Sequence, residues 1–301
     1  QEAGRRLLED LRVSQALSYY SVLASELLGK PFDPAIQERR DSLPFPAFLR
    51  DGLRTIDLLR QGGLAGEATR EAGALAARIR PDLDQARRGE TLLRLALELN
   101  ERGLTREGIN LGWELRREGR PWDRHLLQAV YPFPYREILL AEASERGVDP
   151  FLLAGLIRQE SAFWAEARSR ADARGLMQVL PTTGRALARR QGPDGFRADD
   201  HLYEAEINIH LGSAFFVDMR RRFGEDLPII LSAYNAGPTR ATRWRDYPEF
   251  ADMTRFVERI PFPETRGYVK NVTANRAIYS WLYGSTPEGI RRVERGNRPL
   301  P

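Results

Sequence analysis

Apolar residues recur at helical spacing along most of this 301-residue chain, and strand-like alternation is scarce. Leu92, Leu95 and Leu99 lie three and four residues apart, and Ile56 and Leu59 keep the same interval. Residues at this spacing share one face of an α-helix. The chain has no cysteine, so neither a disulfide framework nor a thiolate metal site can take the place of a packed core. We therefore predict a mainly α-helical protein.

A weak internal repeat indicates how the first helices are organised. Gly63-Leu64, followed by Glu67-Ala68, recurs as Gly103-Leu104, followed by Glu107-Gly108, and each copy opens a helical stretch. Such a period is typical of stacked helical hairpins, in which each unit buries its apolar face against its neighbours. An irregular helical bundle is the alternative.

The segment Tyr131-Pro132-Phe133-Pro134-Tyr135 interrupts the helical pattern. Proline disfavours helix at the residue before it, so the chain should run extended here. We expect a helical domain over 1–130, a second domain over 131–284, and a tail over 285–301 that forms a surface strap or a frayed end.

Charge argues against a nucleic-acid partner. The 46 basic residues are offset by 42 acidic ones, which leaves a formal net charge of +4. Arginines also stand beside acids, as in Arg220-Arg221-Arg222 before Glu225-Asp226, a pattern typical of solvated helix faces. No apolar run approaches the ~20 residues of a membrane span, and the first residues do not resemble a signal peptide.

One acid stands where helices normally carry apolar residues. Asp149 is a good N-cap and Pro150 suits the first helical position, so a helix should begin here. On that helix Glu160 shares a stripe with Leu156 and Ile157. Desolvation would raise the pKa of this carboxyl from about 4.3 towards 6 or 7 and make it a general acid. The alternative is a buried glutamate paired with one of the many arginines.

Four short motifs follow one another within the second domain. They are Glu160-Ser161, Gly175-Leu176-Met177-Gln178, Ala233-Tyr234-Asn235-Ala236-Gly237 and Glu264-Thr265-Arg266-Gly267-Tyr268-Val269. In this order they resemble the motifs of the soluble lytic transglycosylases, a lysozyme-like family that acts on bacterial peptidoglycan. The resemblance runs from about Tyr131 to Tyr283. Upstream it is weaker: Tyr19-Tyr20 followed by Leu23-Ala24, with the helical hairpins, looks like the α-superhelical domain of the large members.

The resemblance implies an activity and a place of action. Such an enzyme cleaves the MurNAc-β-1,4-GlcNAc bond, with Glu160 as the single acid that later acts as base. The 6-hydroxyl of the muramic acid attacks its own anomeric carbon and leaves a 1,6-anhydroMurNAc end, so the second carboxylate of most glycosidases is not needed. Peptidoglycan glycan strands would be the substrate, and the periplasm or cell envelope the location.

The resemblance also implies the substrate-binding residues. These are Ser169, Gln178, Tyr234, Asn235, Tyr268 and Glu264. The sequence departs from the family pattern at Asp172-Ala173, where the family usually has Gly-Ala, and at Leu180, where it often has Met. Glu258 and Glu264 have a second interpretation as ion-pair partners of Arg259 or Arg266.

Two other functions remain open at this point. A lysozyme-type hydrolase of the same fold would need a base, with Glu258 or Glu264 as the first candidate. A non-catalytic cell-wall protein would only bind glycan, while the helical domain recruits cell-wall enzymes. We expect no metal or cofactor, because His125, His201 and His210 form no zinc motif and no phosphate-binding motif occurs.

Overall fold

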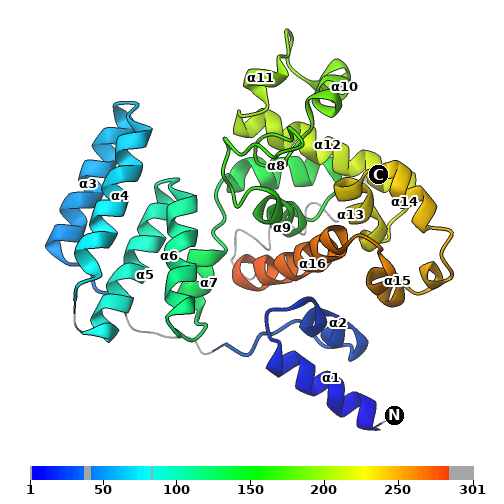
Figure 1. Cartoon of the computed structure of the whole chain (residues 1–301), viewed down its shortest axis with the longest axis horizontal. Coiled ribbons are helices and arrows are strands. Elements are labelled where there is room, and N and C mark those ends of the chain that lie inside the picture. Colours follow the sequence, from blue (N-terminus) through cyan, green and yellow to red (C-terminus); the bar gives the residue numbers. More distant parts are fainter. Residues whose placement is uncertain (1, 37–41, 83, 285–301) are drawn as a thin grey trace. The chain divides into compact units, whose positions relative to one another are not determined.

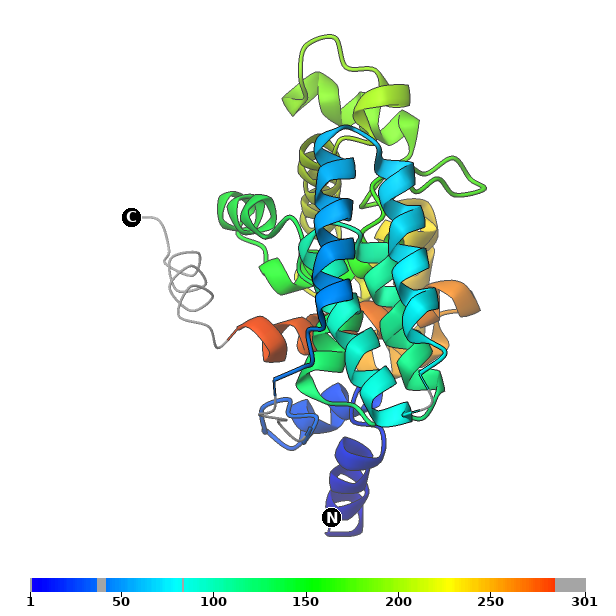
Figure 2. The same ribbon diagram turned by 90° about the vertical axis from the view of Figure 1, so that its left-hand side faces the viewer.

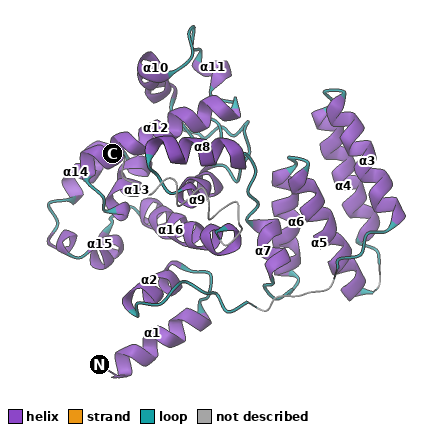
Figure 3. Ribbon diagram, turned by 180° about the vertical axis from the view of Figure 1, so that it is seen from behind, coloured by secondary structure: helices purple, strands orange, loops and turns teal. Residues whose placement is uncertain are grey.

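The protein is described here by a computed structural model, which covers residues 2–36, 42–82 and 84–284. Within these ranges the chain consists of helices joined by turns and loops and contains no β-strand (Figure 3). Extended pairing is limited to isolated bridges that join Arg174 to Arg168 and to Val179. The predicted mainly α-helical class is confirmed. The predicted tail over 285–301 lies outside the described residues.

The chain divides into two compact units (Figure 1). One unit is formed by residues 35–134, and the other joins the segment up to Pro34 with the chain from Tyr135 onwards. The first 34 residues therefore do not belong to the N-terminal helical domain that we expected over 1–130. The physical reason is the helix α2 (Tyr19–Leu27), whose buried residues Val22 and Ala24 belong to the core of the second unit.

The unit 35–134 is built from helical hairpins. Its helices are α3 (Ala47–Gln61), α4 (Ala65–Ile79), α5 (Gln85–Glu101), α6 (Thr105–Arg117) and α7 (Arg124–Val130). Figure 2 shows α3 and α4, in blue to cyan, side by side. Long apolar side chains, among them Leu49, Leu75, Leu92 and Leu115, are buried between the helices.

The sequence repeat of this unit corresponds to a repeated turn. Gly63 and Gly103 adopt left-handed conformations, with φ of +74° and +71°. The following Leu64 donates its N–H to the Leu59 carbonyl at 2.8 Å, and Leu104 does the same to Leu99 at 2.9 Å. Each turn ends one helix and starts the next, so the predicted helical hairpins are confirmed.

The other unit holds the motifs. Its helices are α1 (Glu2–Ser14), α2, α8 (Arg136–Arg146), α9 (Pro150–Glu160), α10 (Pro181–Gln191), α11 (Ala198–His201), α12 (Ala205–Phe223), α13 (Leu227–Ala236), α14 (Pro238–Trp244), α15 (Met253–Arg259) and α16 (Pro263–Tyr283), with a 3₁₀ turn at Pro248–Ala251. None of the described helices combines the length and apolar character required to cross a bilayer.

Helices α9 and α16 form the centre of this unit. They approach closely at Gly155, where an added Cβ would lie 2.9 Å from the backbone nitrogen of Arg276. The Asn275 side chain donates to the Gly155 carbonyl at 3.1 Å. All eight residues from Pro150 to Ile157 are buried. The two helices therefore hold a fixed spacing just before Glu160.

Candidate active site

Helix α9 begins where the sequence predicts and delivers Glu160 at its last turn. The Asp149 carboxylate accepts the Phe151 N–H at 2.8 Å, and Pro150 occupies the first helical position. The helix ends at Glu160, where Ser161 donates its N–H to the Ile157 carbonyl. The predicted N-cap is confirmed. Glu160 is thus the last residue of the buried helix, at the point where the backbone changes direction.

The Glu160 carboxyl is held in a state that favours its proton. Burial raises its pKa from the ordinary value of 4.5 to about 7, and the negative charge of Glu264 acts in the same direction. The Tyr268 hydroxyl donates a hydrogen bond to Oε1 at 2.7 Å and lowers the pKa in part. No arginine pairs with Glu160 in the described part of the chain, so the structure does not support the alternative of a buried ion pair.

The Gly-Leu-Met-Gln motif forms a loop that several helices hold by its backbone. The Ser161 hydroxyl donates to the Leu176 carbonyl at 2.8 Å. The Tyr234 hydroxyl, from α13, donates to the Met177 carbonyl at 2.9 Å. Both donors belong to motifs of their own, so the motifs that are separated in sequence meet at this loop.

Gln178 is oriented by its own loop. Its side-chain nitrogen donates to the carbonyls of Gly175 and Ala167, at 2.9 and 3.2 Å. Because both partners are acceptors, the amide nitrogen must face them and Oε1 must point the other way. Gln178 also has a φ of +50°. The geometry leaves the amide oxygen to accept a hydrogen bond from a ligand.

Tyr234 is less exposed than a sugar-stacking role would need. Its ring is 8% exposed and lies 5.0 Å from the ring of Phe215. Burial and the nearby Glu160 raise its pKa well above the ordinary value, so the hydroxyl keeps its proton and its hydrogen bond to Met177. In this structure Tyr234 supports the loop.

Ser169 and Asp172 close a short turn before the motif loop. The Ser169 hydroxyl accepts the Ala173 N–H at 3.0 Å, and the Ser169 N–H is donated to the Ala173 carbonyl at 2.9 Å. Asp172 adopts a φ of +66°, the conformation for which the family's glycine is suited. Its carboxylate is held between Arg168 and Arg174, and these ion pairs lower its pKa. The departure at Asp172 therefore keeps the loop shape.

The start of α16 completes the site. Thr265 donates its hydroxyl to Oδ1 of Asn235 at 2.7 Å, which ties α16 to the end of α13. Glu264 is exposed and forms no ion pair within the described residues. The structure thus brings Glu160, Tyr268 and Glu264 within electrostatic reach, while Asn235 contacts α16 through Thr265.

Two family models match this chain. The model described as the transglycosylase SLT domain matches residues 137–256, and the model described as the soluble lytic transglycosylase helical domain matches residues 259–288. Soluble lytic murein transglycosylase of Escherichia coli K12 is 31% identical over 225 residues, which are 72% of this chain and 35% of the relative. The chain belongs to the soluble lytic transglycosylase family.

Other relatives agree with this membership. The soluble lytic murein transglycosylase of Salmonella typhimurium is 31% identical over 211 residues, which are 67% of this chain and 32% of that protein. The chain spans about a third of the length of the curated relatives it matches. The helical-domain model matches the region of α16 and does not test the superhelical domain that we expected over 1–130.

Solved structures show the same fold. The 70 kDa soluble lytic transglycosylase SLT70 of Escherichia coli superposes with a TM-score of 0.76 at 24% identity, over 95% of this chain and 44% of that one. A lytic transglycosylase Slt of Pseudomonas aeruginosa gives a TM-score of 0.71 over 93% of this chain and 43% of that one, at 24% identity. The predicted superhelical and lysozyme-like architecture is confirmed.

Asn208 also holds the motif loop, a role that was not predicted from the sequence. It is fully buried on α12, and its Oδ1 accepts the Met177 N–H at 2.7 Å. Its Nδ2 donates to the carbonyls of Arg174 and Leu202, at 2.9 and 2.7 Å. The signal was present, because Asn208 is a polar residue on the buried stripe with Leu211 and Gly212.

Glu258 is not a free carboxylate facing Glu160. It pairs with Lys270 at 2.8 Å and accepts a hydrogen bond from the Tyr20 hydroxyl at 3.1 Å. The expected partners Arg259 and Arg266 contact other groups: Arg259 pairs with Glu249, and Arg266 donates to backbone carbonyls. Glu258 thus holds the N-terminal segment against α16.

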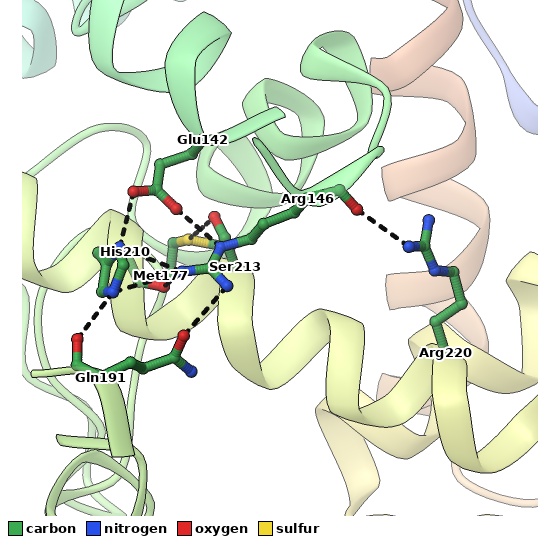
Figure 4. Close-up of polar contacts among 7 residues, drawn as sticks. All are labelled: Glu142, Arg146, Met177, Gln191, His210, Ser213 and Arg220. Atoms are coloured by element: carbon green, nitrogen blue, oxygen red, sulfur yellow. Dashed lines mark hydrogen bonds and ion pairs between the residues drawn. The ribbon is translucent and has the colours of Figure 1, made fainter. Parts of the chain in front are cut away.

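A second polar cluster joins helices of the unit that carries Glu160 (Figure 4). His210 contacts the Glu142 carboxylate at 2.7 Å and the Gln191 carbonyl at 2.9 Å. Arg146 donates to the other Glu142 oxygen at 2.7 Å, and Ser213 contacts the Met177 sulfur at 3.8 Å. This cluster ties α8, α10 and α12 together and has a structural role. In the described ranges of the chain, nowhere do three or more His, Asp or Glu side chains gather as metal donors.

Proposed function

We propose that this chain is a peptidoglycan lytic transglycosylase that cleaves the MurNAc-β-1,4-GlcNAc bond and leaves 1,6-anhydroMurNAc ends. The observation that carries the proposal is the state of Glu160: a carboxyl with a pKa raised to about 7, hydrogen-bonded to Tyr268, in a chain of this family. A carboxyl that holds its proton near neutral pH is suited to protonate a leaving oxygen.

The chemistry needs one enzyme carboxyl. Glu160 gives its proton to the glycosidic oxygen while the bond from that oxygen to the anomeric carbon breaks. The 6-hydroxyl oxygen of the same sugar then bonds to the anomeric carbon, and its proton returns to Glu160. Atoms and charge balance without a water molecule. The attack is intramolecular and gains from proximity.

Tyr268 stabilises Glu160 in the ionised state that follows the first proton transfer. Its hydroxyl donates to Glu160 and is itself kept protonated, because burial and the nearby carboxyl raise its pKa well above the ordinary value. A donor at this place stabilises the carboxylate that exists after the first proton transfer. Tyr268 therefore tunes the acid without giving up its own proton.

The remaining site residues are proposed to contact or shape the glycan. Gln178 offers Oε1 as an acceptor for a sugar hydroxyl or amide, as its hydrogen bonds dictate. Ser169, in its exposed turn, and Glu264, at the start of α16, supply polar groups to the strand. Tyr234 and Asn235 act through the loop and through Thr265.

One observation keeps a hydrolase as the second candidate. Glu264 is exposed and its charge reaches Glu160, so a water between them could be activated. Glu258, the other candidate base, is engaged with Lys270 and Tyr20. The products separate the two reactions, since a hydrolase leaves reducing ends.

Digestion of purified peptidoglycan tests the proposal. Mass spectrometry should find 1,6-anhydro ends from the wild type and none from Glu160→Gln, with Glu166→Gln as an exposed control of the same charge change. Reducing ends from the wild type would favour the hydrolase. Glycan binding without any turnover would favour the non-catalytic function, and activity in Glu160→Gln would sink the assignment. The Pseudomonas aeruginosa relative bears on this test, because an inactive mutant of it is a Glu-to-Gln substitution.

Location and partners follow from the substrate. A peptidoglycan-cleaving enzyme acts in the periplasm or cell envelope, and we propose that location here. Glycan strands are the proposed binding partner, and the hairpins of unit 35–134 offer a surface for other cell-wall enzymes. Cross-linking in intact cells, with and without the unit 35–134, would test the second of these partners.

A further inference from the structure

Three exposed apolar side chains in the unit that carries Glu160 lie close in sequence to its motifs. In the described chain from 135 to 284, the large apolar residues more than a third exposed are Trp164, Leu180 and Phe262. Trp164 follows Glu160 by four residues, Leu180 follows Gln178 by two, and Phe262 precedes Glu264 by two. Single exposed apolar residues are common, and α1 and α2 of the same unit also expose Leu7, Val13, Tyr20 and Leu27, so exposure alone does not mark a ligand surface.

Phe262 is the best defined of the three. The residue is 42% exposed, yet its ring is held in place from two sides. The ring of Trp244, itself buried, meets it edge to face with centroids 5.5 Å apart. The guanidinium of Arg240 lies 5.3 Å from its centroid. An aromatic ring fixed in this way loses little conformational freedom when a ligand stacks on it.

The position of Phe262 connects it to the reacting centre. It directly precedes α16, and six residues later Tyr268 contacts Glu160. At 1.5 Å per helical residue, this separation is roughly 9 Å along the helix axis. Thr265 ties this turn of α16 to Asn235, so the segment between Phe262 and Tyr268 is anchored. Phe262 therefore lies at the end of α16 that is nearest to the contact with Glu160.

The chemistry of the ring matches a pyranose. One face of a hexopyranose presents C–H groups and little polarity, and an exposed aromatic ring buries that face from water. Arg240 beside the ring adds a cation for the carboxylates that peptidoglycan strands carry on their lactyl-linked peptides. We propose that Phe262, supported by Trp244 and Arg240, is a sugar-binding position of the glycan groove beyond the cleaved bond. This inference rests on the proposed function of the Glu160 site.

The dependence of cleavage on the length of the glycan substrate tests this proposal. Phe262→Ala should raise the KM for long peptide-free glycan strands about tenfold, the loss expected of one aromatic stacking contact. The kcat on the shortest fragment that the wild type cleaves should change less than about twofold, since that fragment does not reach the ring. Phe262→Trp should restore the KM, and Phe262→Leu, which keeps bulk without a ring face, should not. Leu27→Ala, at a residue 60% exposed on α2, is the matched control.

Measurement of strand binding tests the role of Phe262 independently of the proposed catalysis by Glu160. In a Glu160→Gln background, the strand affinity should fall about tenfold when Phe262→Ala is added, whatever products the wild type makes. If Phe262→Ala behaves like Leu27→Ala in both assays, the inference is overturned. An equal loss of kcat on short and long substrates would also overturn it, because Phe262 would then only support α16. Failure of Glu160→Gln to abolish cleavage would instead contradict the proposed function.

Discussion

At the residue scale, the proton of Glu160 is controlled by two neighbours that act in opposite directions. The Tyr268 hydrogen bond stabilises the carboxylate and lowers the pKa. The charge of Glu264 opposes a second negative charge and raises it. The net result lies close to 7 because burial outweighs both neighbours. Each neighbour can be removed by a change of very few atoms.

The pH dependence of kcat should therefore move in opposite directions in two variants. A general acid must be protonated, so activity falls as the pH rises through the pKa of Glu160. Tyr268→Phe removes the lowering contact and should shift this alkaline limb to higher pH. Glu264→Gln removes the raising charge and should shift it to lower pH. A pH–rate profile of the three proteins measures both shifts. Shifts of the same sign would contradict the assignment of the limb to Glu160.

Glu160 should also cost stability in alkaline solution. The unfolded carboxyl ionises near 4.5, whereas the folded one ionises near 7, so folding opposes ionisation between these values. Stability therefore falls as the pH rises from about 4.5 to 7, by up to about 3 kcal/mol. Glu160→Gln should remove this loss and be more stable than the wild type at pH 8, with a smaller difference at pH 5. Urea unfolding at the two pH values measures it; equal differences at both would contradict the raised pKa.

At the element scale, α12 contributes one side chain, Asn208, to the support of the motif loop. Asn208→Ala would leave the Met177 N–H and the carbonyls of Arg174 and Leu202 without their partner. We expect a loss of about 3 kcal/mol in the free energy of unfolding. Asn208→Asp keeps an acceptor for Met177 but places a second oxygen against the carbonyls of Arg174 and Leu202, so it should destabilise at least as much as Asn208→Ala. Urea denaturation measures this, with exposed Asn271→Ala as a control that changes stability by less than about 0.5 kcal/mol. Equal effects at both positions would contradict the role of Asn208.

Two glycines of α4 and its turn should respond oppositely to the same substitution. Gly63 has a φ of +74° and open space around a new Cβ, so Gly63→Ala introduces backbone strain alone, about 1 kcal/mol. Gly73 lies within the helix and also faces open space, so Gly73→Ala should stabilise by about 0.5–1 kcal/mol. Thermal unfolding of both variants should show shifts of opposite sign. A stabilised Gly63→Ala would show that the turn is not held in the left-handed conformation.

The elements of this protein could largely be predicted from its sequence, and the site only in part. Helical spacing, the Asp149 cap and the repeated Gly-Leu turn are local signals, and the structure follows them. The contact of Tyr268 with Glu160 joins residues far apart in the chain, and helical spacing does not predict it. The roles of Gln178 and Tyr234 as loop supports could not be read, because a side chain's partners depend on tertiary packing.

At the scale of the whole molecule, the first residues belong with the motif-bearing unit. Lys270, two residues after Tyr268, donates to Glu258 and to the Tyr20 hydroxyl, both at 2.8 Å. It also lies 4.9 Å from the Tyr20 ring. The helical pattern of this segment is like that of the hairpins and predicts that it belongs to the first domain. Which core an amphipathic helix joins is decided by long-range contacts that periodicity does not reveal.

Removal of the first 34 residues should therefore weaken the unit that carries Glu160. Loss of α2 uncovers part of α16 and leaves Lys270 and Glu258 without Tyr20, so we expect the Tm to fall by at least about 5 °C. Removal of residues 1–14 alone should change it by less than about 2 °C, because α1 contains no buried residue. Differential scanning calorimetry of the two truncations measures the effect. An unchanged Tm in the longer truncation would contradict the packing of α2.

The close approach of α9 and α16 at Gly155 predicts where mutations should abolish function. A methyl group at this position would meet the backbone of Arg276 and could be accommodated only by moving one helix. That movement would displace Glu160, which lies five residues further along α9, and separate it from Tyr268 on α16. Loss-of-function alleles should therefore arise at Gly155, a position with no side chain and no chemistry. Gly155 would then set the distance between Glu160 and Tyr268, although it has no reactive group of its own.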